Sequence, residues 1–116
     1  MPAIHKNDAQ VSDLMQKLIQ MHITYIYSGY WQCDRFIFEA QEKVICAVVN
    51  EDLSQGLTRY APYATIVHAD PRASYVFPQN TPYQVNFERK IAQSHQHFRK
   101  LVIDGYVIYQ PIVPAQ

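Results

Sequence analysis

Apolar residues recur along this chain with a helical period in four segments. Over residues 8–22, Val11, Leu14, Leu18 and His22 are spaced three or four apart, so they share one face of an amphipathic helix. Segments with the same spacing alternate with more polar or more β-favouring stretches. The helices predicted in this way cover residues 8–22, 31–41, 62–69 and 81–94.

Between these helices lie short runs of β-branched and aromatic residues, which favour strands. Residues 44–49 (VICAVV) are almost entirely apolar, a composition typical of a strand that is covered on both faces in a parallel sheet. Asp104 and Gly105 separate two apolar runs, and this dipeptide is a strong signal for a β-hairpin. The predicted strands are residues 23–28, 44–49, 73–77, 98–103 and 106–110.

The alternation of helices and strands predicts an α/β fold. We expect three layers, with a mainly parallel sheet joined by βαβ crossovers and an antiparallel hairpin at the C-terminal end. A chain of 116 residues corresponds to one domain, residues 1–116. For residues 31–41 an alternative is open, in which residues 35–39 form a strand that turns at Glu42 and Lys43.

Polar residues mark where two of the helices begin. Asn7 or Asp8 can cap the first helix. Thr81 is expected to cap the fourth helix, with Pro82 at its first position and Gln84 reaching back as in a capping box.

Composition narrows the classes of partner. Ten basic and ten acidic residues give a formal net charge of zero, so the surplus of Lys and Arg that polyanion binding needs is absent, and we expect no nucleic acid. A neutral chain also has little charge repulsion between copies, which favours self-association into a homo-oligomer. No apolar run reaches the roughly 20 residues that span a bilayer, and no signal peptide is evident. On its own, such a chain is expected in the cytoplasm.

Signatures of catalysis and cofactor binding are missing from the sequence. With three glycines there is no G-x-G-x-x-G and no phosphate-binding loop, and no G-x-S-x-G elbow is present. His95 and His97 lack further ligands at zinc-site spacing. We therefore expect no cofactor, no metal and no identifiable catalytic residue.

The end of the first strand carries the best candidate for a binding site. Ligands of α/β sheets bind beyond the carboxyl ends of the strands. Gly29 allows close approach there, and Tyr30 and Trp31 offer flat faces that stack on sugars or rings. Arg59 and Tyr60, on the loop after the second strand, can reach the same edge. The alternative is that Tyr30 and Trp31 simply close the core.

Two further groups of residues each allow two interpretations. Cys33 and Cys46 are either two buried thiols or, in an oxidising compartment, a disulfide. The charge run of Asp34, Arg35, Glu39 and Glu42 is a solvated helix face by default. If these side chains lined a pocket, the chain would instead be a small stand-alone enzyme.

A pattern of aromatic residues links these segments to a known family. The chain resembles the soluble C-terminal region of bacterial GT-C-type membrane glycosyltransferases, which are related to dolichyl-phosphate-mannose–protein mannosyltransferases. The resemblance covers roughly residues 14–110. The residues that carry it are Tyr30 and Trp31, then Phe38, Glu39 and Glu42, then Arg59, Tyr60 and Tyr63, and finally Ala73, Tyr75, Val76 and Phe77.

The resemblance implies an extracytoplasmic domain beside a membrane-embedded catalytic unit. In such enzymes the catalytic acids lie in loops of the membrane region, so this domain is expected to be non-catalytic. It would bind a glycan or acceptor, or pack on the membrane-embedded region of the parent protein. An oxidising location would also favour a bond between Cys33 and Cys46.

Overall fold

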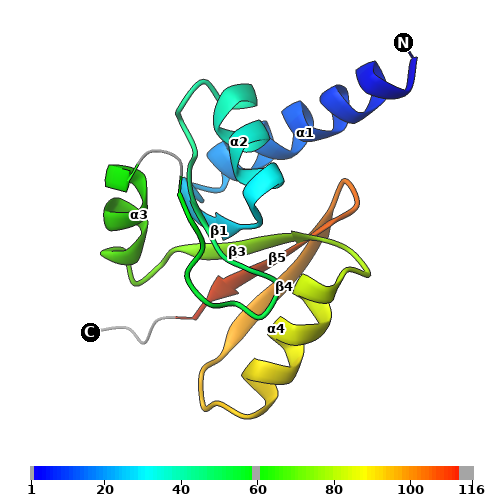
Figure 1. The fold of residues 1–116 in the computed structure, drawn as a ribbon. Coiled ribbons are helices and arrows are strands. Elements are labelled where there is room, and N and C mark those ends of the chain that lie inside the picture. Colours follow the sequence, from blue (N-terminus) through cyan, green and yellow to red (C-terminus); the bar gives the residue numbers. More distant parts are fainter. Residues whose placement is uncertain (1, 59–60, 113–116) are drawn as a thin grey trace.

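The structure, a computed structural model, describes residues 2–58 and 61–112, with the backbone alone over residues 2–8. Within these residues lie four helices and five strands, which alternate as far as α4 and end in two consecutive strands (Figure 1). The helices are α1 (Pro2–Gln20), α2 (Tyr30–Glu39), α3 (Ala61–His68) and α4 (Pro82–Ala92). The strands are β1 (Tyr25–Ser28), β2 (Ile45–Val48), β3 (Ser74–Pro78), β4 (Phe98–Ile103) and β5 (Tyr106–Pro111).

The strands form one sheet in the order β2-β1-β3-β5-β4. β1 pairs in parallel with β2 and with β3, while β5 runs antiparallel to both β3 and β4. The predicted α/β class is therefore confirmed, as are the parallel strands joined through helices and the antiparallel hairpin. The hairpin turns at Asp104 and Gly105, whose φ angles of 55° and 80° are those of a tight two-residue turn.

Helices pack on both faces of the sheet. Successive strand side chains point to opposite faces, so each strand feeds two clusters of buried residues. α1 and α2 bury their apolar stripes against Ile26, Cys46, Val48, Val76 and Ile108. α3 and α4 pack against the alternate positions, which are Tyr27, Ala47, Tyr75, Phe77, Val107 and Tyr109.

Two predictions about helix ends are corrected. α1 begins at Pro2 rather than near Asp8, because Pro2 suits a first helical position and no Gly or Pro interrupts residues 3–7. Gln84 does reach back at the start of α4, but its Oε1 accepts the N–H of Asn80 at 2.7 Å. Thr81 is the N-cap residue and Pro82 begins the helix, as predicted, but the Thr81 hydroxyl donates to the Pro78 carbonyl at 2.8 Å and makes no capping bond to the helix.

The segment 30–39 is helical, so the alternative hairpin over residues 35–39 is wrong. In the part of the chain that the structure describes, no helix combines the length and the apolar character needed to cross a membrane.

Candidate functional site

A cleft of about 390 Å³ lies between α2 and the chain that leads from β2 into α3. We call it the α2 cleft. Its floor is apolar and its rim carries carboxyl, amide and hydroxyl groups. The lining residues are Cys33, Asp34, Ile37, Phe38, Gln41, Glu42, Cys46, Val48, Thr58 and Tyr63.

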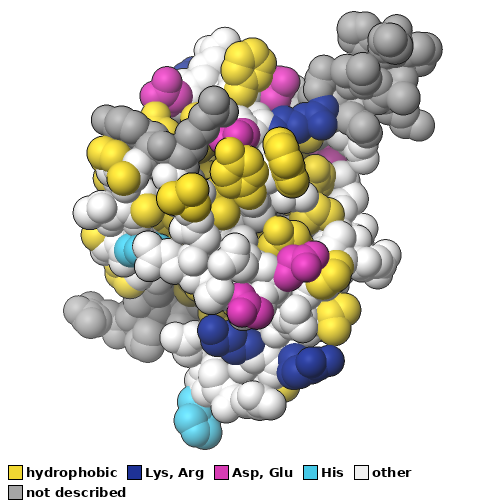
Figure 2. Space-filling model, in the orientation of Figure 1, with side chains coloured by type: hydrophobic (Ala, Val, Ile, Leu, Met, Phe, Trp, Pro, Cys, Tyr) yellow, Lys and Arg dark blue, Asp and Glu magenta, His cyan; other side chains and the backbone are white. Residues whose placement is uncertain are grey.

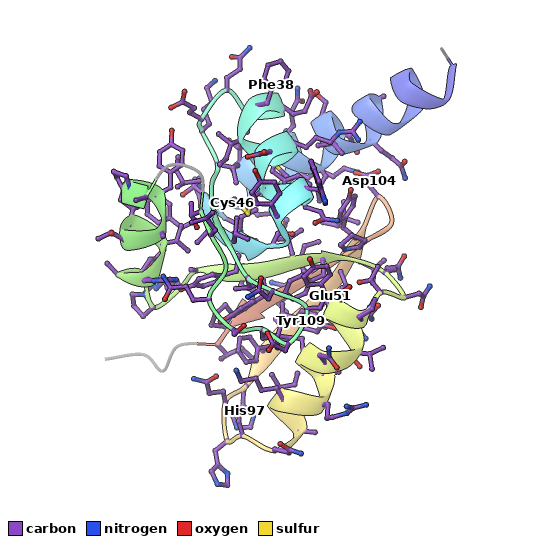
Figure 3. The ribbon with its side chains drawn as sticks, in the orientation of Figure 1. Phe38, Cys46, Glu51, His97, Asp104 and Tyr109 are labelled. Atoms are coloured by element: carbon purple, nitrogen blue, oxygen red, sulfur yellow. A yellow bond between two sulfur atoms is a disulfide. The ribbon has the colours of Figure 1, made fainter. Side chains whose placement is uncertain are left out.

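One side of α2 forms the inner wall of the cleft. Asp34 and Phe38 are four residues apart, so the helix places them on one face, and Gln41 follows in the turn after the helix. Trp31 lies three residues before Asp34 and continues that face toward the start of the helix. Phe38 stands at the outer end of α2 (Figure 3), where 79% of its surface is exposed.

The floor of the cleft is built on a disulfide between Cys33 and Cys46. Their Cα atoms are 5.2 Å apart, and the bond ties α2 to β2. Both cysteines are almost completely buried, which fits a structural bond and not a reactive thiol pair.

The outer wall is the chain that follows β2 and turns back along it. Val49 bridges Gln55 in antiparallel fashion, and the N–H of Gly56 donates to the Val48 carbonyl at 2.9 Å. The N–H of Val48 in turn donates to Oγ1 of Thr58 at 3.1 Å, which fixes Thr58 at the cleft. A side chain at Gly56 would lie 2.6 Å from Cγ1 of Val48, so this close return needs glycine.

A contact between α3 and the end of α2 closes one end of the cleft. The Tyr63 hydroxyl donates to Oε2 of Glu42 at 2.5 Å. Glu42 and the preceding Gln41 both have positive φ angles, 64° and 51°, which non-glycine residues adopt at some cost in energy. The turn after α2 is therefore held in a strained conformation at the rim of the cleft.

Tyr30 and Trp31 lie where the sequence placed them, directly after β1, and their rings meet edge to face at 5.2 Å. Trp31 is 79% exposed, so the alternative that it closes the core is wrong. Leu57, on the outer wall of the cleft, is 80% exposed. Figure 2 shows hydrophobic side chains gathered on this face, over α2 and the chain leading to α3. Arg59 and Tyr60, the other two predicted ligand-binding residues, lie outside the described residues.

The expected close approach of a ligand at Gly29 is corrected by the structure. The side chain of Tyr83, at the start of α4, fills this place: a Cβ on Gly29 would lie 2.5 Å from its hydroxyl. The loop after β2 also crosses to α4, where Nδ2 of Asn86 donates to the Glu51 carbonyl at 2.8 Å (Figure 3). The protein thus fills its own carboxyl-end crevice, and the α2 cleft lies to the side of it.

The charge run of α2 is divided between the cleft and its surroundings. Asp34 and Glu42 line the cleft, while Arg35 and Glu39 do not. Among the described residues, no three His, Cys, Asp or Glu side chains come together as a metal site. The arrangement offers hydrogen-bond acceptors and aromatic faces around an apolar floor.

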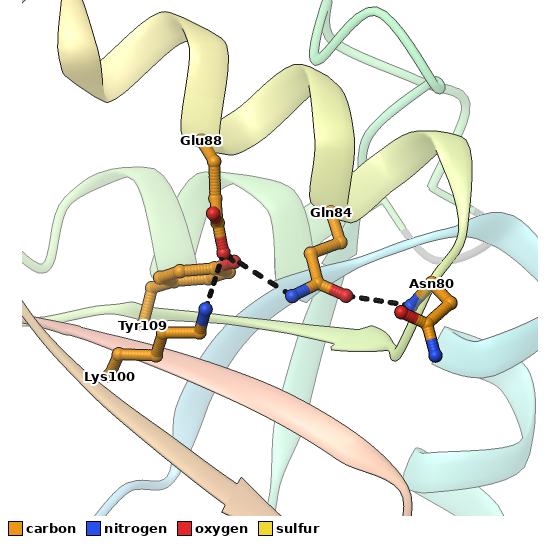
Figure 4. Close-up of polar contacts among 5 residues, drawn as sticks. All are labelled: Asn80, Gln84, Glu88, Lys100 and Tyr109. Carbon is orange, nitrogen blue, oxygen red and sulfur yellow. Dashed lines mark hydrogen bonds and ion pairs between the residues drawn. The ribbon is translucent and has the colours of Figure 1, made fainter.

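A second polar cluster joins α4 to the sheet (Figure 4). Oε2 of Glu88 accepts hydrogen bonds from Nζ of Lys100 at 2.7 Å and from the Tyr109 hydroxyl at 2.5 Å. These bonds lower the pKa of Glu88 to about 2, whereas burial and the bond to Glu88 raise the pKa of Tyr109 above its ordinary value. Sequence reasoning missed this cluster, although Gln84 and Glu88 stand four apart on one helix face. It fastens the helix to the sheet, and Glu88, Lys100 and Tyr109 also line a hollow of about 650 Å³ between α4 and the C-terminal hairpin.

No known protein family, curated protein or solved structure matches this chain.

Proposed function

We propose that this chain is a non-catalytic accessory domain of a membrane glycosyltransferase, and that its α2 cleft holds part of a glycan or its acceptor. The observation that carries the proposal is the pairing of aromatic walls with a polar rim. Phe38 and Tyr63 line a hollow that also presents Asp34, Gln41 and Thr58.

The chemistry of the cleft suits a neutral, hydroxyl-rich ligand. A sugar ring has apolar C–H faces that pack on aromatic rings, and hydroxyl groups that donate to carboxylates and amides. Asp34 and Gln41 supply such acceptors on the rim. The described residues of the lining include no Lys or Arg, so these residues do not favour a phosphate or carboxylate ligand.

The hollow also has a suitable size. Its volume of about 390 Å³ lies at the lower end of the range for small-molecule sites. The exposed Tyr30–Trp31 pair lies one turn along α2 from Asp34 and extends the aromatic surface beyond the hollow. A chain of sugar residues could therefore continue from the cleft onto this pair. The proposal includes the three-layer arrangement predicted from the sequence, in which α2 belongs to one of the outer layers.

A titration followed by fluorescence tests this function, because Trp31 is the single tryptophan of the chain. The probes are methyl glycosides and short neutral oligosaccharides of mannose, glucose and galactose. A saturable change in emission supports the proposal. The absence of any change at millimolar ligand, with the domain folded, contradicts it. Turnover of a glycoside that Asp34→Asn abolishes would identify the cleft as catalytic, as in a small stand-alone enzyme.

A second candidate function is packing against a protein surface, such as the membrane-embedded region of a parent protein or another copy of this chain. It is favoured by three large apolar side chains, Trp31, Phe38 and Leu57, each exposed by about four-fifths on or beside α2. Where the partner is another copy of this chain, sedimentation at several concentrations distinguishes packing from glycan binding. Self-association that Phe38→Asp removes, without any response to glycans, would favour packing.

A further inference from the structure

Three tyrosines on adjacent strands form a row across the face of the sheet that α3 and α4 cover. Tyr27 of β1 is the register partner of Tyr75 of β3, which is the partner of Tyr109 of β5. We call these residues the tyrosine row. Side chains in register on neighbouring strands point the same way, so the row is a continuous aromatic strip.

The ring faces of Tyr27 and Tyr75 are occupied by other rings. The two rings stack on each other with centroids 4.6 Å apart. His68 of α3 stacks against Tyr27 at 5.5 Å, and Phe87 of α4 packs against Tyr75 at 4.6 Å. What remains for a ligand is therefore the edge of each ring and its hydroxyl group.

These two tyrosines line a hollow of about 410 Å³, distinct from the α2 cleft and on the other face of the sheet. We call it the tyrosine pocket. Its polar lining comes from Tyr27, Tyr75, Asp70, His95, Gln96 and His97, and its apolar lining includes Phe98 and Ile112. No described residue hydrogen bonds to the hydroxyl of Tyr27 or Tyr75. By contrast, the hydroxyl of Tyr109, the third member of the row, is already bonded to Glu88.

A carboxylate lies in this pocket beside the imidazole rings of His95 and His97. Asp70 is the one carboxylate among its described lining residues, and no Lys or Arg is among them. One oxygen of Asp70, Oδ1, accepts the N–H of Arg72 at 2.9 Å, which orients the group. Burial, followed by the charges of Tyr75 and Asp70, raises the pKa of Tyr27 to about 12, so its hydroxyl keeps its proton at neutral pH.

From this geometry we propose that the tyrosine pocket binds a small hydroxylated amine. The Asp70 carboxylate pairs with the ammonium group, and the two tyrosine hydroxyls exchange hydrogen bonds with the hydroxyl groups of the ligand. Anions are disfavoured because they would meet Asp70 without any lysine or arginine to balance it. The site is separate from the α2 cleft, so the two proposals stand or fall independently.

Three probes of similar size test the proposal on the unmodified chain. They are 2-amino-1,3-propanediol, glycerol and glycerate, which differ in charge at similar size. Backbone NMR shifts at Ala73 and Phe98 report binding in the pocket. We expect saturable shifts with the amine. Glycerol should bind more weakly than the amine, by about tenfold or more, because it lacks the one charge-assisted hydrogen bond to Asp70. Equal binding of glycerol, tighter binding of glycerate, or no saturable shift with the amine would overturn the proposal.

Variants then assign the contacts. Asp70→Asn should weaken binding of the amine by about tenfold. Glu39→Gln, which makes the same change of charge on α2, should leave binding unchanged. Tyr27→Phe keeps the stacked ring and removes only the hydroxyl, so it should weaken binding while the fold persists. Tight binding that survives both Asp70→Asn and Tyr27→Phe would place the amine elsewhere and refute the assignment.

Discussion

The Tyr63 hydroxyl donates to Oε2 of Glu42 at 2.5 Å and so joins α3 to the turn after α2. The two residues stand 21 positions apart in the sequence, and both line the α2 cleft. The bond therefore sets the spacing between the two walls of the candidate site. It also links the strained turn at Gln41 and Glu42 to a helix on the other side of the sheet.

Removal of this bond should widen the cleft more than it destabilises the protein. Tyr63→Phe keeps the ring and loses the exposed hydrogen bond to Glu42, and such a bond contributes about 1 kcal/mol or less to the free energy of unfolding. We expect a small shift of the urea midpoint, together with changed NMR shifts at Phe38 and Gln41. A loss of several kcal/mol, or no shift change at α2, would show that the bond does not hold the cleft.

The disulfide should contribute much more to stability. Cys33 and Cys46 are 13 positions apart, and closing a loop of that size stabilises a small domain by about 3 kcal/mol. The double variant Cys33→Ala and Cys46→Ala should lower the free energy of unfolding in urea by about this amount. A control with dithiothreitol should destabilise the natural chain and leave the double variant unchanged. Equal stability of the oxidised chain and the double variant would contradict the structural role.

Gly29 should be intolerant of any side chain, because the side chains of both Gln32 and Tyr83 lie against it. A Cβ there would come 2.5 Å from the hydroxyl and 2.7 Å from Cζ of Tyr83. Gly29→Ala is therefore expected to cost about 1–3 kcal/mol, the range for overpacking of a filled site. In a chain that already carries Tyr83→Leu, the same change should cost clearly less. Equal costs in both backgrounds would mean that the two residues are not in contact.

Glu88 makes stability depend on pH in the acid range. Its pKa is lowered from 4.5 to about 2, first by the hydrogen bond from Lys100 and then by that from Tyr109. The stabilisation is thus complete above pH 4.5, where the carboxyl of the unfolded chain is ionised, and is lost as the pH falls toward 2. Because its side chain is 42% exposed, we expect a contribution of about 1 kcal/mol.

Comparison of the natural chain with Glu88→Gln in urea at several pH values measures this contribution. The difference in free energy of unfolding should be largest above pH 5 and should shrink as the pH approaches 2. Glu39→Gln serves as the control for a change of charge. A difference that grows on acidification would have the wrong sign for this mechanism.

Local patterns predicted the elements of the fold because each depends on neighbouring residues. The 3.6-residue spacing around Phe36 located α2, and the Asp104–Gly105 turn located the final hairpin. The beginning of α1 was missed because apolar residues are not regularly spaced in its first turns. The helix continues there since no residue breaks it.

The site could be predicted only in part, because its shape depends on contacts between distant segments. The exposed corner of Tyr30 and Trp31 follows from the end of β1 and the start of α2. Tyr83 fills the crevice at Gly29 because of the way α4 packs on the sheet. The spacing of residues in the sequence does not reveal this packing. The cleft beside α2 likewise arises from the return of the chain along Val48, held by hydrogen bonds at Gly56 and Thr58.

The most direct test of the account compares glycan affinity in two variants that each truncate one exposed apolar side chain. Phe38→Ala removes an aromatic wall of the α2 cleft, and Val102→Ala changes β4, away from the cleft, at a residue that is 55% exposed. The methyl glycoside that binds most tightly is titrated, and Trp31 fluorescence reports its binding. Affinity should be lowered by about tenfold in Phe38→Ala, because stacking on one aromatic ring contributes about 1 kcal/mol or more. Val102→Ala should bind like the natural chain. Equal affinity in the two variants would contradict the assignment of glycan binding to the cleft.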